Sequence, residues 1–153
     1  MPRKIISVTK QVMFDCAHYL VNDQKSREEN IKMFHKCCLY KEDGTEEPHG
    51  HTYHLEVTVT GTIDEDNGFV IDFKKLKNIL TEKIVDQLDH RLINNIEKIG
   101  SLATAENILC FIWDEIEEPI NALRPRQAYL TRIRLWETPD SFATMSLPPC
   151  GNR

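Results

Sequence analysis

The alternation of hydrophobic and polar positions predicts four main β-strands. It is strongest over residues 52–63, where apolar side chains alternate with threonine, histidine and glutamate. Successive side chains of a strand point to opposite faces, so this alternation is typical of an antiparallel strand with one buried face. After a turn, residues 69–71 form a short apolar segment that we interpret as a further strand. The other three main strands are predicted at residues 5–20, 128–137 and 142–147.

Helical spacing predicts two longer helices between these strands. Asp72 is expected to cap a helix that runs to about Leu88, and Thr104 is expected to cap a second one. The second helix should end at about Glu118, because Pro119 has no amide hydrogen to continue it. The apolar stripe of the first helix is predicted to be Phe73, Leu76, Ile79, Leu80, Ile84 and Leu88.

A shorter helix is predicted near the N-terminus. Ser26 and Glu29 have the spacing of a capping box, which indicates a helix that ends at Phe34. The segment that follows, residues 36–48, is polar and is interpreted as a loop.

Strands and helices are grouped along the chain, which indicates an α+β fold. We expect a four-stranded antiparallel sheet with two helices on one face. No repeat or linker is visible, so residues 1–153 are interpreted as a single domain. A sheet of this kind has two open edges, and we expect subunits to pair edge to edge into a homo-oligomer.

Charge and composition narrow the class of protein. The net charge is −5 without a basic block, which argues against nucleic acid as a partner but allows a phosphorylated small molecule. No stretch approaches the roughly 20 apolar residues of a membrane span, and no signal peptide is visible at the N-terminus. The five cysteines lack a disulfide-scaffold spacing, so reduced thiols and a cytoplasmic location are expected.

Three histidines are candidate metal ligands. His49 and His51 flank Gly50 beside the strongest strand, so both imidazoles fall on one face. His18 occupies another apolar strand. Three imidazoles leave one tetrahedral position open, as in catalytic zinc sites, and we predict Zn²⁺ as the cofactor. The alternative is a pair of surface histidines and one unrelated histidine.

Two adjacent thiols are candidates for proton transfer. Cys37 and Cys38 follow the short helix and precede the histidine pair. Near Lys36 and a bound Zn²⁺, a thiol would have a lowered pKa and could act as a base or nucleophile. The alternative is a pair of partly buried thiols without a role.

Two further groups could take part in the chemistry. Asp89 precedes His90 at a helix end, where a carboxylate can set the tautomer and charge of the ring; a helix-end cap is the alternative. Glu137 could accept two parallel hydrogen bonds from the edge of a guanine or pterin, and Thr104 and Glu106 could contact the same heterocycle. An ordinary strand glutamate and an ordinary N-cap are the alternatives.

Several short motifs span most of the chain, and the set is far more specific than any one of them. The motifs are Phe14-Asp15-Cys16-Ala17-His18, Phe34-His35-Lys36-Cys37, His49-Gly50-His51-Thr52-Tyr53, Gly68-Phe69-Val70-Ile71-Asp72-Phe73, Leu88-Asp89-His90, Thr104-Ala105-Glu106-Asn107 and Trp136-Glu137-Thr138. In this order they resemble the 6-pyruvoyl-tetrahydropterin synthase / 6-carboxytetrahydropterin synthase family.

The resemblance implies the tunnelling fold, in which the sheets of several subunits join into a barrel. Such proteins are usually hexamers built of two trimers, with active sites between subunits. By resemblance, the catalytic thiol is Cys37, with Cys38 as the alternative, and the proton relay is Asp89 with His90. His18, His49 and His51 match the zinc ligands, and Glu137 matches the residue that anchors the pterin.

The segment between the thiols and the histidine pair departs from the family pattern. The spacing from Cys37 to His49 is longer than usual, because residues 39–48 include an inserted acidic loop. The run Glu46-Glu47-Pro48-His49-Gly50-His51 is similar to a variant in which a glutamate, here Glu46, takes over the task of the thiol and the product is a hydroxymethylpterin.

The resemblance implies 7,8-dihydroneopterin triphosphate as the substrate. From the Phe-Asp-x-Ala-His and Val-Ile-Asp-Phe runs we expect a 6-carboxy-5,6,7,8-tetrahydropterin synthase, which releases acetaldehyde and triphosphate in queuosine and 7-deazaguanine biosynthesis. The helix before Cys37 favours the alternative, a 6-pyruvoyl-tetrahydropterin synthase of a tetrahydrobiopterin-type pathway, and Glu46 favours the hydroxymethylpterin-forming variant. A zinc-containing module that binds a pterin or purine without turnover is the non-enzyme alternative.

Overall fold

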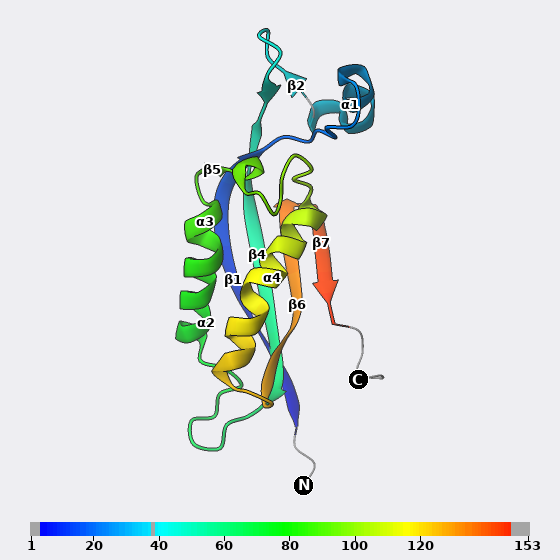
Figure 1. Ribbon diagram of the computed structural model, residues 1–153. Coiled ribbons are helices and arrows are strands. Elements are labelled where there is room, and N and C mark those ends of the chain that lie inside the picture. The colour runs from blue at the N-terminus through cyan, green and yellow to red at the C-terminus, as the bar shows by residue number, and fades with distance from the viewer. Residues whose placement is uncertain (1–3, 38, 148–153) are drawn as a thin grey trace.

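The computed structural model describes residues 4–37 and 39–147, and its centre is an antiparallel sheet (Figure 1). The strands β1 (Ile5–His18) and β4 (His49–Thr62) pair along their whole length, which places His18 opposite His49. Strand β4 also pairs with β6 (Ala128–Thr138), and β6 pairs with β7 (Ser141–Ser146). The four predicted main strands are therefore confirmed.

A fifth strand corrects the predicted number. β5 (Arg91–Leu92) pairs with β1 in parallel, so the order of the main sheet is β5-β1-β4-β6-β7. The His90 amide donates to the Asp15 carbonyl at 2.6 Å, which brings the two residues that follow alongside β1. This contact joins positions far apart in the sequence, and the local pattern did not contain it.

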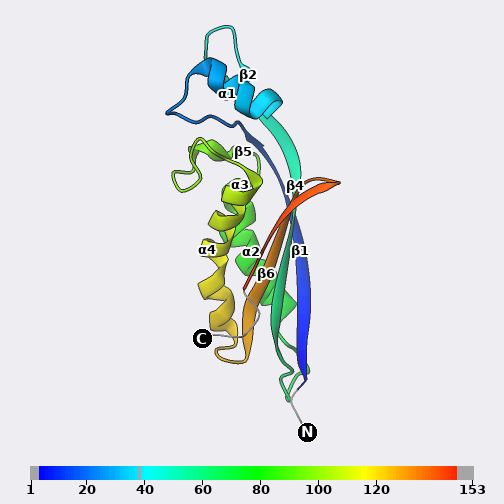
Figure 2. The same cartoon turned by 90° about the vertical axis from the view of Figure 1, so that its right-hand side faces the viewer.

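Helices cover one face of this sheet, as predicted (Figure 2). α2 (Phe73–Leu80), a π-helical turn (Thr81–Val85) and α3 (Asp86–Leu88) follow one another, and α4 (Ala105–Leu123) lies beside them. The apolar face of β4 packs beneath them. Its side chains Tyr53, Leu55, Val57 and Val59 are all fully buried.

The predicted helix caps are confirmed, but the end of α4 is not. The Asp72 carboxylate accepts hydrogen bonds from the amides of Lys74 and Lys75, and Thr104 accepts one from the Asn107 amide. Pro119 lies inside α4, which continues to Leu123.

Packing outweighs the hydrogen bond that α4 loses at its proline. Ile116 and Ile120 on either side of the proline are buried in the core, and this burial offsets the roughly 3 kcal/mol cost of a proline in a helix. Phe73 was expected in the buried stripe but is 46% exposed, because the helix has only just begun there.

Residues 69–71 do not form the predicted strand. Val70 and Ile71 are buried, but the Phe69 and Val70 carbonyls accept hydrogen bonds from Nη1 of Arg124, at 2.9 and 2.8 Å. The same nitrogen donates to the Thr62 carbonyl at 2.7 Å. A guanidinium thus takes the place of a neighbouring strand, so the apolar segment remains a loop.

The segment before the histidine pair projects beyond one end of the main sheet (Figure 1). It contains α1 (Arg27–Phe34), a 3-10 turn (His35–Cys37) and a small sheet of β2 (Leu39–Tyr40) and β3 (Glu46–Glu47). The predicted capping box of α1 is present. The loop predicted at residues 36–48 is wrong in part, since β2 and β3 pair within it; Cys38 lies outside the described residues.

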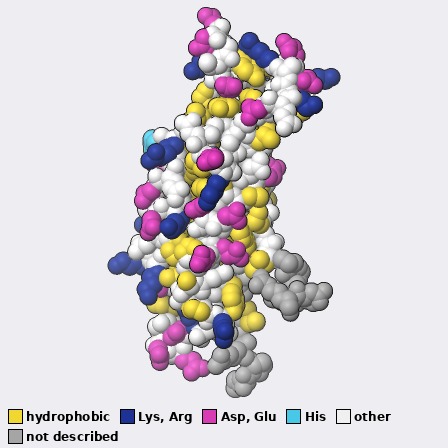
Figure 3. Space-filling view, viewed as in Figure 1, with side chains coloured by type: hydrophobic (Ala, Val, Ile, Leu, Met, Phe, Trp, Pro, Cys, Tyr) yellow, Lys and Arg dark blue, Asp and Glu magenta, His cyan; other side chains and the backbone are white. Residues whose placement is uncertain are grey.

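Acidic and basic side chains are interspersed over the face that the helices present to solvent (Figure 3). In the part of the chain that the structure describes, no helix has the length and apolar character to cross a membrane.

Candidate functional site

Three histidines meet at one end of the β1–β4 pair. The register places His18 opposite His49 and Cys16 opposite His51, so the three rings lie on the buried face of two adjacent strands. Their donor nitrogens all lie within 4.8 Å of one another. The predicted convergence of His18, His49 and His51 is therefore confirmed.

The hydrogen bonding of His18 suits a metal ligand. Its Nδ1 lies 2.7 Å from the Ala103 carbonyl oxygen, so Nδ1 is the donor and Nε2 carries the free lone pair. That Nε2 lies 3.0 Å from Nε2 of His49, close to the spacing of about 3.3 Å between neighbouring ligand atoms around tetrahedral zinc. The three imidazoles therefore fit a zinc ion.

Burial favours the neutral form of two of these rings, His18 and His49, which is the form that binds metal. It lowers the pKa of His18, which is 1% exposed, although the Ala103 carbonyl and Glu137 oppose the shift. It also lowers the pKa of His49, with smaller contributions in the same direction from His18 and His51. Nδ1 of His49 is buried and has no hydrogen-bond partner among the described residues.

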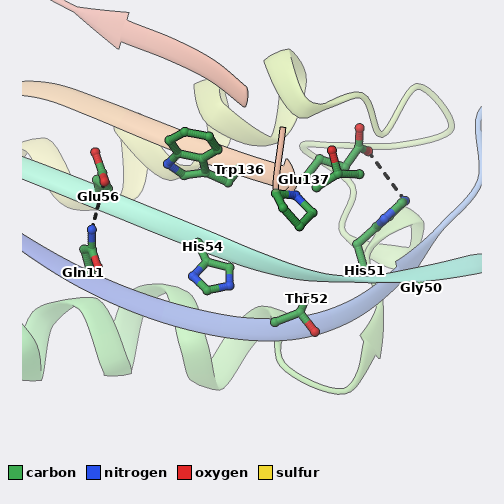
Figure 4. Close-up of a pocket in the computed structure, with 10 residues that line it drawn as sticks. Gln11, Gly50, His51, Thr52, His54, Glu56, Trp136 and Glu137 are labelled. Atoms are coloured by element: carbon green, nitrogen blue, oxygen red, sulfur yellow. Dashed lines mark hydrogen bonds and ion pairs between the residues drawn. The ribbon is translucent and has the colours of Figure 1, made fainter. Parts of the chain in front are cut away.

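Glu137 extends from the end of β6 toward the same cluster (Figure 4). Its Oε1 lies 3.5 Å from Nε2 of His18 and 3.8 Å from Nε2 of His51. The register of β6 with β7 shifts between Trp136 and Thr138, and such an irregularity can re-aim a side chain. The side chain is 28% exposed, so it reaches the histidines and still faces open space.

Tyr53 is a site residue to which the sequence motifs assigned no role of its own. Its hydroxyl donates to Oε1 of Glu137 at 3.3 Å. Burial and then the charge of Glu137 raise the pKa of Tyr53 well above its usual range, so the hydroxyl stays protonated. The spacing along the sequence could have indicated this residue, because Tyr53 shares a strand face with His49 and His51.

The predicted thiol and the predicted substrate-binding residues share one hollow. Cys37, Thr104, Glu106 and Glu137 are among the residues that line a cavity of about 260 Å³. The 3-10 turn that carries Cys37 is tied to the end of β1, because the Leu20 amide donates to the Cys37 carbonyl at 2.8 Å. The structure thus brings these four predicted residues together beside the histidine cluster.

Asp89 and His90 form a pair, but His90 lines a different hollow from that of Cys37. Oδ2 of Asp89 lies 2.8 Å from Nδ1 of His90, and Oδ1 accepts from the Asp15 amide at 2.8 Å. The Asp15 amide and then His90 hold the pKa of Asp89 below its usual range. The hollow beside His90 measures about 510 Å³ and is also lined by His51 and Thr52.

The largest of these hollows, about 770 Å³, borders the histidine cluster where the pairing of β4 with β6 ends (Figure 4). His51, Trp136 and Glu137 line it. The hollows therefore adjoin one another through His51 and Glu137.

Glu46, an alternative proton-transfer group, is less well placed than Cys37. Glu46 lies in β3 and is not among the residues that line the three hollows.

Comparisons with known proteins agree with this geometry. The family model described as 6-pyruvoyl tetrahydropterin synthase matches residues 7–147. The 6-pyruvoyl tetrahydrobiopterin synthase of Dictyostelium discoideum is 35% identical over 144 residues, which cover 93% of this chain and 96% of that protein. The 6-carboxy-5,6,7,8-tetrahydropterin synthase of Haemophilus influenzae is 28% identical over 160 aligned positions, which cover 90% and 96%.

A solved structure is similar in fold. The 6-pyruvoyl tetrahydropterin synthase of Caenorhabditis elegans superposes with a TM-score of 0.78 and 26% identity. The match covers 97% of this chain and all of that chain.

Proposed function

The chain belongs to the 6-pyruvoyl tetrahydropterin synthase family, and from that premise we propose that it is a zinc-dependent lyase acting on 7,8-dihydroneopterin triphosphate. The proposed products are 6-pyruvoyltetrahydropterin and triphosphate. One observation carries the proposal: three imidazole nitrogens converge within 4.8 Å beside a carboxylate that faces open space. Such a set can hold a metal and a nitrogen heterocycle next to each other.

The histidines and Glu137 would bind metal and substrate. His18, His49 and His51 would hold Zn²⁺. The bound ion would supply Lewis acidity toward the hydroxyl oxygens of the substrate's side chain. The Glu137 carboxylate would accept hydrogen bonds from the amino group and ring N–H of the pterin edge. Thr104 and Glu106, which line the same hollow, would contact the heterocycle and limit its orientation.

Cys37 and the Asp89–His90 pair would move protons. Cys37 lines the hollow that Glu137 borders, so its thiolate can remove a proton from the substrate side chain. Asp89 accepts from Nδ1 of His90, which leaves Nε2 of that ring to take or deliver the partner proton. Elimination of triphosphate then accompanies the internal redox rearrangement to the pyruvoyl side chain.

The exposure of His90 supports a homo-oligomer. Its side chain is 79% exposed, and the pair does not line the hollow of Cys37. An assembly with sites between subunits would let the pair of one copy reach substrate held by another. We therefore propose a hexamer of two trimers, joined through open sheet edges.

Two observations favour the pyruvoyl product over the carboxy product expected from sequence runs. The relative with 35% identity is a 6-pyruvoyl tetrahydrobiopterin synthase, and α1 precedes Cys37 as the animal-type resemblance implies. The 6-carboxytetrahydropterin synthase activity is the second candidate, favoured by the relative that is 28% identical over 90% of the chain.

Product analysis tests the proposal. Purified zinc-loaded protein is incubated with dihydroneopterin triphosphate, and the pterins are identified by mass spectrometry. We expect 6-pyruvoyltetrahydropterin; a 6-carboxy product with acetaldehyde would establish the second candidate, and a hydroxymethylpterin would establish the Glu46-type variant. Pterin binding without triphosphate release would show a binding module and overturn the lyase assignment.

A further inference from the structure

One carboxylate oxygen lies between the metal-ligand candidates and a buried tyrosine. Oε1 of Glu137 accepts from the Tyr53 hydroxyl at 3.3 Å. The same oxygen lies 3.5 Å from Nε2 of His18 and 3.8 Å from Nε2 of His51. The tyrosine and a metal at the histidines would therefore compete for one oxygen atom.

The distances from Glu137 to the histidines are short enough for such competition. Neighbouring ligand atoms around a tetrahedral zinc are about 3.3 Å apart. The two distances from Oε1 of Glu137 to the imidazoles exceed this spacing by only a few tenths of an ångström. A small movement would make Glu137 a fourth ligand and would close the position that catalytic zinc sites keep open for substrate.

Tyr53 is more rigidly held than Glu137. The tyrosine is fully buried, and its ring stacks on Phe14 with centroids 5.4 Å apart. It also meets the rings of His18 and His51 edge-on, at centroid distances of 6.3 and 5.7 Å. The hydroxyl therefore has a fixed direction, whereas the partly exposed carboxylate can adjust to it.

We propose that Tyr53 is a positioning residue that keeps Glu137 available to the heterocycle and prevents it from becoming a metal ligand. Its hydroxyl holds Oε1 as a hydrogen-bond acceptor, so the carboxylate does not occupy the open coordination position. The inference rests on the proposed function, in which Glu137 binds the pterin edge and the three histidines hold zinc.

The substitution Tyr53→Phe tests this role, because it removes the hydroxyl and keeps the buried ring. Zinc affinity is measured without substrate, by competition with a chromophoric chelator. Freed from its donor, Glu137 should join the metal as a fourth ligand, and we expect zinc to bind about tenfold more tightly. The size of this change is that of outer-shell effects on metal affinity, but its sign is the opposite of the usual loss. The KM for the pterin should rise by about tenfold, with a smaller change in kcat, because the carboxylate no longer faces the heterocycle.

Two controls separate this role from general damage to the core. In the double variant Tyr53→Phe/Glu137→Gln, the gain in zinc affinity should disappear, because an amide is a poor zinc ligand. Tyr129→Phe alters an exposed tyrosine of β6 and should leave zinc affinity and KM unchanged. Unchanged or weaker zinc binding by Tyr53→Phe would overturn the proposal.

A third variant keeps the test decisive if Tyr53→Phe does not fold. Glu137→Gln retains an acceptor for Tyr53, so zinc affinity should change by less than about tenfold if Glu137 is not a ligand in the native protein. A larger loss would show that the carboxylate already binds the metal and would overturn the positioning role. Absent turnover by the native protein would instead contradict the proposed function, since the zinc titrations need no substrate.

Discussion

His18 lies in the half of the candidate site that would hold the metal, and His90 lies in the half that would move protons. The two side chains differ most in their exposure to solvent. His18 is 1% exposed, with one ring nitrogen on the Ala103 carbonyl and the other beside His49. His90 is 79% exposed, and its ring contacts the neighbouring Asp89. The half that would hold metal is completed by strands of one chain, whereas the half that would move protons is open to solvent or to another copy.

The backbone explains this difference. Strand pairing between β1 and β4 fixes the positions of His18, His49 and His51 together. His90 follows α3 in a left-handed conformation, with φ of 56°, and its own amide and the Asp89 carboxylate tie the pair to β1. The sheet therefore holds the candidate metal ligands rigidly, whereas the proton-transfer pair stays accessible to solvent or to another copy of the chain.

The largest expected effect comes from a substitution in the buried half of the site, among the candidate metal ligands. His49→Ala removes a ligand nitrogen 3.0 Å from that of His18, so bound zinc and turnover should both be lost. Zinc is measured by elemental analysis of dialysed protein. His54→Ala changes a histidine on the opposite face of the same strand and should retain zinc. A full zinc complement in His49→Ala would contradict the ligand assignment.

The next effect should come from Cys37, the thiol that lines the same hollow as Glu137. Cys37→Ala should lower kcat by about 10²- to 10⁴-fold, because it removes a general base without touching the metal ligands. Zinc content should be unchanged. Cys110→Ala replaces an exposed thiol on α4 and serves as the matched control. Native turnover in Cys37→Ala would move the proton transfer to another group such as Glu46.

A smaller loss is expected from the exposed half. Asp89→Asn removes the carboxylate that accepts from His90 and should lower kcat by about 10- to 100-fold with zinc retained. Steady-state kinetics and elemental analysis measure the two quantities. Loss of zinc from this variant would show that the two halves are not independent.

Complementation then tests whether the halves come from different chains. Cys37→Ala and His90→Gln chains are co-expressed and purified as mixed oligomers. If the thiol of one copy works with the histidine of a neighbour, some mixed sites contain both native residues, and part of the turnover returns. Mixed oligomers as inactive as their parents would place both residues in the same chain.

The smallest expected effect is on the pH dependence of folding stability. Hydrogen bonds from the Asp15 amide and His90 lower the pKa of Asp89 from its ordinary value of 3.8. Its contribution to stability is therefore present above pH 3.8 and is lost as the pH falls through the lowered folded value. Urea midpoints of native protein and Asp89→Asn should differ at pH 6 and converge in strong acid; parallel curves would contradict this.

The local pattern of residues determined which side chains share a face. Alternation along β4 placed His49, His51 and Tyr53 on the buried side, and the capping residues Asp72 and Thr104 marked where helices begin. These features depend on neighbours within a few positions, because strand and helix periods act over that range. They are the features that the sequence predicted correctly.

Only the tertiary structure decided which groups meet across the chain. Tyr53 and Glu137 are 84 residues apart, and their hydrogen bond depends on the register of β4 with β6 and the irregularity at Trp136. Likewise, Arg124 kept residues 69–71 from becoming a strand. Register and long-range hydrogen bonds arise when distant segments pack, so their geometry is absent from any local pattern and appears only in the folded chain.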